Sequence, residues 1–286
     1  MKKTVLAMLA FASFAMTAQD LPAPSPSSTL EQRVGLTDFT VEYSRPGVKG
    51  REIFGELVPN GKVWRTGANK ATAIEFNTPV TFAGQLVPAG KYSLFTIPNQ
   101  DTWTVILNKN TELWGADGYD EKQDVFRVDV AATTTKESTE TFTIDFQSIV
   151  DGKAELVIRW ANTLVKLPFE VDVQSKAIAN IKAALANANE DDLWKVNRSA
   201  AIYYTRNDID HKAALEYIEN AIKLNPNNWY SYLVHGEVLF ALGENKKAVK
   251  AAEKAMEIGM EEANKANKEF AYVGMLESFM EEWSAK

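Results

Sequence analysis

Apolar and polar residues alternate along most of the chain between residues 38 and 173. Phe39-Thr40-Val41-Glu42-Tyr43 is typical, and the same period of two recurs in residues 91–95, 103–107, 126–130, 142–146, 156–160 and 165–173. Alternation rich in β-branched and aromatic residues predicts half-buried strands. Turn signals separate these strands at Pro88-Ala89-Gly90, Asn99-Gln100-Asp101 and Asp151-Gly152. The pattern predicts about nine short strands in an antiparallel β-sandwich or barrel, and we favour the sandwich.

From Gln174 onward the apolar spacing becomes helical. Ala177, Ile178, Ile181, Ala184 and Leu185 share one helix face. The sequence therefore predicts a β-sandwich domain over residues 28–173 and an α-helical domain over residues 174–286.

The helical part contains a short repeat. Ala214 and Ala221 recur 34 residues later as Ala248 and Ala255, and Gly236 and Gly243 stand where close helix packing and a turn are needed. This spacing resembles the tetratricopeptide repeat, in which small residues let paired helices approach. About two units are visible, and a helix over residues 261–282 is expected to cap them. Helical repeats of this kind commonly dock a protein partner, and a simple cap on the sandwich is the alternative.

The N-terminus has the features of an export signal. Lys2 and Lys3 precede an apolar run over residues 4–16, which is too short to span a bilayer. We expect a signal peptide over residues 1–18, a Pro/Ser-rich linker over 19–27, and a periplasmic or secreted mature protein. A buried N-terminal helix is the alternative. No later segment has the length and apolarity of a membrane span.

Residue composition limits the chemistry available to the β domain. The chain has no cysteine, and its two histidines, His211 and His235, both follow residue 174. Histidine-dependent nucleophilic triads and histidine-ligated metals are thus excluded from the β domain, and we predict no cofactor. The carboxylates of residues 117–124 are read as a solvated loop, with oxygen-ligated calcium as the alternative. Asp208 and Asp210 are expected to form a turn and a helix N-cap before His211.

One segment departs from the acidic character of the chain. The net charge is −7, yet residues 43–70, here called the basic segment, carry six Lys/Arg and two acids. Arginine offers a planar fork of donors for carboxylate, phosphate or sulfate, and aromatic rings offer stacking faces. We predict a site for a small anionic or glycan ligand. Its candidate residues are Tyr43, Arg45, Lys49, Arg51, Trp64, Arg65 and Asn69.

Two other interpretations of the basic segment remain open. In the first, its arginines pair with Glu52, Glu56, Glu75 or backbone carbonyls and only stabilise long loops, as in a structural envelope protein. In the second, one of these carboxylates acts as a base beside the Arg/Lys cluster of an enzyme. Nucleic acid is not an expected partner, because six basic residues in an acidic chain do not form a long cationic stripe.

Two blocks of sequence carry a family resemblance. YSRPGVKGREIFGELVPNGKVWRTGANKATAIEF and LVPAGKYSLFTIP resemble the domain-of-unknown-function 2911 family of exported proteins from Bacteroidetes-type bacteria. The resemblance covers residues 28–173 and implies a β-rich domain behind a signal peptide, often with a helical tail. It implies no activity, substrate or catalytic residue. The hypothesis of an anion site therefore depends on the residues of the basic segment alone. Whether the protein is an enzyme stays open, and we favour a non-catalytic role.

Overall fold

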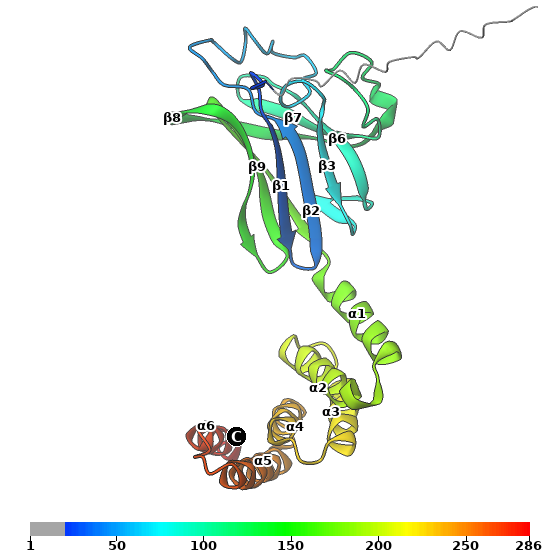
Figure 1. Ribbon diagram of the computed structural model, residues 1–286, viewed down its shortest axis with the longest axis vertical. Helices are drawn as coiled ribbons and strands as arrows, with labels where there is room; N and C mark the ends of the chain where they lie inside the picture. Colours follow the sequence, from blue (N-terminus) through cyan, green and yellow to red (C-terminus); the bar gives the residue numbers. More distant parts are fainter. Residues whose placement is uncertain (1–20) are drawn as a thin grey trace, which may run out of the picture. The chain divides into compact units, whose positions relative to one another are not determined.

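The computed structural model describes residues 21–286. The expected signal peptide and the first two residues of the expected linker lie outside this range. The described part up to Val173 forms one compact unit, and Gln174–Lys286 form a second. A β unit followed by helices confirms the fold class predicted from hydrophobic periodicity (Figure 1).

Nine strands of the described chain form one antiparallel sheet in the order β1-β2-β3-β6-β7-β8-β9-β4-β5. Their bounds are β1 Ser27–Val34, β2 Thr37–Ser44, β3 Thr72–Phe76, β4 Val80–Phe82, β5 Gln85–Val87, β6 Gly90–Ile97, β7 Thr102–Asn108, β8 Asp124–Val150 and β9 Lys153–Val171. The sheet folds over at β8, so that its two halves face each other. Phe39 of β2 thus packs 5.0 Å from Phe169 of β9, between ring centroids.

The expectation that all strands are short was wrong for β8 and β9, the two longest strands. Residues 126–130 and 142–146 belong to one strand, β8, and residues 156–160 and 165–171 both belong to β9. The intervening Thr-rich stretch has no apolar alternation, and the pairing of β8 with β9 shifts register within it, between Thr134 and Thr139 and again before Thr143. The predicted turns at 88–90, 99–101 and 151–152 all separate consecutive strands.

Two long loops lie at the end of the β unit opposite the β1–β2 hairpin (Figure 1). The first joins β2 to β3 and contains most of the basic segment. The second joins β7 to β8 over residues 109–123 and includes the short 3₁₀ helix Glu121–Gln123. The loops pair with each other, because Ala71 donates its N–H to the Leu113 carbonyl over 3.0 Å.

The second unit consists of helices whose buried faces are rich in alanine. The helices are α1 Val173–Asn187, α2 Glu190–Arg206, α3 His211–Leu224, α4 Trp229–Ala241, α5 Asn245–Lys265 and α6 Val273–Ser284. The four repeat alanines, Ala214, Ala221, Ala248 and Ala255, are all fully buried. Asp210 caps α3 as expected, since its carboxylate accepts the N–H groups of Lys212 and Ala213.

The prediction of a single capping helix over residues 261–282 was wrong. Helix α5 continues through Met260 to Lys265, the chain turns with Asn267 at φ 51°, and α6 begins at Val273. Gly236 of α4 allows the close approach of α6, because a Cβ there would lie 2.5 Å from the Trp283 ring. Close helix packing therefore does require glycine at this position, as its sequence context indicates.

Candidate functional site: a cationic cavity

A cavity of about 480 Å³ opens beside the basic segment. Four cations line it, and none of the described lining residues is an Asp or Glu. The cations are Lys49, Arg51, Lys62 and Arg65. Trp64, Asn69 and Trp160 also line this cationic cavity. It is therefore strongly positive within an acidic protein.

Arg65 is the one arginine of the cavity lining whose side chain has no hydrogen-bond partner among the described residues. It is half-buried, and no hydrogen bond or ion pair joins its guanidinium to the described residues. Its Nε is inaccessible to water and lacks an acceptor. Burial lowers the pKa of Arg65 below its ordinary value, while the charge of Asp117 opposes that shift. The Nε–H donor is thus held without the acceptor that a buried donor normally requires.

The backbone around Arg65 holds an uncommon conformation. Thr66 is fully buried and β-branched, yet has φ 53°, and Asn69 has φ 61°. Side-chain hydrogen bonds hold this loop: the Thr72 hydroxyl donates to the Thr66 carbonyl over 2.6 Å. Left-handed backbone at a β-branched residue is strained, and such strain concentrates at functional sites.

Two tryptophans form the aromatic part of the lining. The Trp64 and Trp160 rings stack with centroids 5.8 Å apart. Trp64 donates its Nε1–H to the Gly67 carbonyl over 3.0 Å, whereas the buried Nε1 of Trp160 has no partner among the described residues. Arg65 and Trp160 are the two described residues of the β unit with such an orphaned polar side-chain atom, and both line the cavity.

Other basic residues have structural partners. Arg45 donates Nε–H to the Phe142 carbonyl over 3.0 Å and Nη2–H to the Thr143 hydroxyl over 2.9 Å. Arg51 donates to the carbonyls of Val48 and Gly47. For these two arginines, the backbone-pairing interpretation describes the contacts, although Arg51 still lines the cavity.

Tyr43 and Arg45 do not lie in the cavity lining. Tyr43 is buried, its hydroxyl donates to the Ile144 carbonyl and accepts the Ile144 N–H, and its ring contacts Phe142 edge-on. The structure thus brings together Lys49, Arg51, Trp64, Arg65 and Asn69 of the seven candidate residues.

The segment before β1 also contributes to the wall. Pro24 and Ser25 line the cavity, the Pro24 carbonyl accepts from Lys49 Nζ over 3.3 Å, and the Pro26 carbonyl accepts the Arg45 N–H over 2.8 Å. This part of the expected linker is therefore attached to the β unit.

Several residues of the lining were not among the candidates, including Lys62, Trp160 and Pro24. Lys62 belonged to the basic segment but was not selected, whereas Trp160 and Pro24 lie far from it in the sequence. The density of basic residues was sufficient to select Lys62. No local signal identifies the other two. The candidate bases Glu52, Glu56 and Glu75 are exposed and do not line the cavity.

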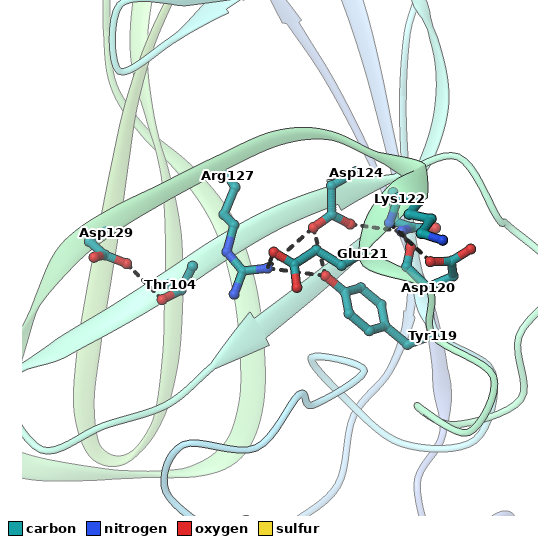
Figure 2. Close-up of polar contacts among 9 residues, drawn as sticks. Thr104, Tyr119, Asp120, Glu121, Lys122, Asp124, Arg127 and Asp129 are labelled. Carbon is teal, nitrogen blue, oxygen red and sulfur yellow. Dashed lines mark hydrogen bonds and ion pairs between the residues drawn. The ribbon is translucent and has the colours of Figure 1, made fainter.

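The carboxylate-rich loop forms a hydrogen-bonded cluster at the start of β8 (Figure 2). Asp124 accepts from the Tyr119 hydroxyl over 2.6 Å, from Asn108 Nδ2 over 2.8 Å and from Arg127 Nη1 over 3.3 Å. Within the described residues, no group of His, Cys, Asp and Glu has the arrangement of a metal site. This cluster joins the β7–β8 loop to the sheet.

The fold and cavity define an antiparallel β-sandwich with a cationic pocket near its long loops. Residues 25–169, or 145 of the 286 residues, match the family described as "Protein of unknown function (DUF2911)", and the chain belongs to that family. No curated protein and no solved structure matches the chain. Among the described helices, none is long and apolar enough to cross a membrane.

Proposed function

We propose that the β unit is a non-catalytic binding module for a small organic anion or an acidic sugar, held in the cationic cavity. The supporting observation is the half-buried Arg65 guanidinium, which has no acceptor among the described residues. A buried donor without a partner costs about 1–3 kcal/mol. A carboxylate, phosphate or sulfate group supplies charge-assisted acceptors for such a fork.

The two alternatives are less well supported. A purely structural role accounts for Arg45 and Arg51, which donate to protein acceptors, but provides no partner for Arg65. An enzyme of the expected type requires a carboxylate base within reach of the substrate. The described lining residues include no carboxylate.

Thermal-shift and calorimetric titrations with sulfate, phosphate and glucuronate test the proposal. A ligand at 100 times its Kd stabilises the folded state by about 2.7 kcal/mol. We expect wild-type protein to show this shift and Arg65→Ala to lose it, while the unliganded variant keeps a melting temperature close to wild type. Because binding is electrostatic, added salt should weaken it.

Arg33→Ala is the matched control. Arg33 is exposed and pairs with Asp38 across the β1–β2 hairpin, outside the cavity lining. This variant should bind as wild type does. The proposal is wrong if none of the three anions stabilises wild type. It is also wrong if Arg65→Ala retains the full shift, or unfolds early by the roughly 3–5 kcal/mol expected for a broken buried ion pair.

For the helical unit, we propose that α2–α5 are two units of the tetratricopeptide type. Full burial of Ala214, Ala221, Ala248 and Ala255 at a spacing of 34 residues supports this assignment. A protein partner for these helices stays a prediction.

We further propose that the protein is exported and that residues 1–18 are removed. The support is the charged and apolar pattern of that segment. Mass spectrometry of protein purified from an exporting host should find a mature N-terminus near Gln19. An intact Met1, or recovery in the membrane fraction alone, contradicts the proposal.

A further inference from the structure

Trp114 is the most exposed large apolar side chain of the described residues, at 73%. Its backbone is nevertheless well held. Lys70 and Trp114 form an isolated antiparallel bridge, and the neighbouring Lys70 Nζ and Glu112 Oε2 are 3.3 Å apart. An exposed indole on a loop whose backbone is held in place offers a flat apolar surface to a ligand ring.

Trp114 lies next to two parts of the cationic cavity. Its bridge partner Lys70 follows Asn69, which lines the cavity. The next residue, Gly115, is so close to Arg65 that a Cβ there would lie 4.0 Å from Nη1 of that guanidinium. Consecutive Cα atoms are about 3.8 Å apart. The indole is therefore attached one residue from the point where the loop contacts Arg65.

The net charges around the cavity and around Trp114 differ. Arg65 and the other lining cations favour an acidic group in the cavity. Beside Trp114, Lys70 and Glu112 form an ion pair, so their two charges offset each other. This pair therefore offers no net positive charge to a second anionic group beside the indole. The combination suits a ligand with an acid at one end and an uncharged ring at the other.

We propose that Trp114 is a stacking subsite for a neutral sugar ring whose neighbouring unit carries the acid bound at Arg65. This inference rests on the proposed function and specifies its ligand class as a glycan with an acidic sugar next to an uncharged one. The apolar face of the neutral ring covers the exposed indole, while the acid occupies the cavity.

Calorimetric titrations with two probes test the subsite. The probes are glucuronate and a disaccharide of glucuronate and an uncharged hexose. Wild type should bind the disaccharide about three- to ten-fold more tightly, as expected for one aromatic stacking contact. Trp114→Ala should lose this preference and still bind glucuronate, whereas Trp114→Phe should keep most of it. Leu86→Ala, which alters another strongly exposed apolar side chain, should change neither affinity.

Tryptophan emission gives a second measurement. The disaccharide should shift the wild-type emission to shorter wavelength, and the part of the shift due to Trp114 should be absent from Trp114→Phe. Equal affinity for the two probes in wild type, or an unchanged preference in Trp114→Ala, overturns the subsite while glucuronate binding keeps the cavity proposal intact. If glucuronate and the disaccharide both fail to bind wild type, the subsite proposal is wrong. If sulfate and phosphate also fail to bind wild type, the cavity proposal is wrong too.

Discussion

The indole rings of Trp64 and Trp160 stack in the β unit with 5.8 Å between their centroids and 15° between their planes. Both rings belong to the hydrophobic core, and both residues line the cationic cavity. Trp103 and Phe142 meet Trp64 edge-on from two other strands. The inner wall of the candidate site is therefore also part of the structure that stabilises the fold.

The Trp64–Trp160 pair gives a prediction about stability. Trp160→Ala should lower the free energy of unfolding of the β unit by about 3–5 kcal/mol, because it leaves a large cavity beside Trp64. Urea denaturation followed by near-ultraviolet circular dichroism measures the change. Trp114→Ala is the control, since removal of an exposed indole should stay within about 0.5 kcal/mol of wild type. Similar losses in the two variants contradict the core role of Trp160.

The hydrogen bond from Tyr119 to Asp124 predicts a pH dependence. Burial, together with the hydrogen bond to Asp124 and that residue's charge, raises the pKa of Tyr119 well above its ordinary value of about 10. The folded state thus favours the neutral phenol more than the unfolded state does. Its contribution to stability is complete below pH 10 and is lost as the pH rises from there toward the raised folded pKa.

Comparison with Tyr119→Phe isolates this effect. Unfolding midpoints between pH 8 and pH 12 should fall more steeply for wild type than for the variant. The variant keeps the smaller alkaline dependence of Tyr92, whose pKa is also raised by burial. Parallel curves for the two proteins rule out a contribution from Tyr119.

Two glycines of the helical unit should respond oppositely to alanine. At Gly236 a Cβ would lie 2.5 Å from the Trp283 ring and 3.1 Å from the Ala248 carbonyl oxygen, so Gly236→Ala should separate α4 from α6. At Gly274 in α6 a Cβ meets nothing within 4 Å. Gly274→Ala should stabilise the helix by up to about 1 kcal/mol. Thermal unfolding followed at 222 nm should show a lower midpoint for the first variant and an equal or higher one for the second.

The repeat alanines give a further prediction for the same unit. Ala248→Leu should cost about 1–3 kcal/mol, because the added carbons overpack a fully buried position. Ala241→Leu is the matched control, since Ala241 is exposed at the end of α4. Equal melting curves for Ala248→Leu and wild type show that the 34-residue spacing does not reflect a packed interface.

Local sequence was informative wherever structure depends on near neighbours. Alternation located β2, β6, β7 and parts of β8 and β9, but not β1, β3, β4 or β5. Asp151-Gly152 marked the β8–β9 turn, and Asp210 marked the start of α3. Local sequence was insufficient where a strand forms because of its hydrogen bonds to a distant strand. The Thr-rich part of β8 is a strand because β9 supplies its hydrogen bonds, with Thr133 opposite Leu164, although its own pattern has no apolar face.

For the candidate site, too, one part could be predicted from the sequence and another depended on the tertiary structure. The sequence by itself determined that arginine, lysine and tryptophan gather within residues 43–70, because residue type and spacing are local properties. Only the tertiary structure decided which arginine is left without a partner. Arg45 finds its acceptor on Phe142, 97 residues away, whereas Arg65 meets no acceptor among the described residues. Hydrogen-bond partners depend on which distant segments fold together, and so the distinction between a structural and a free guanidinium cannot be read along the chain.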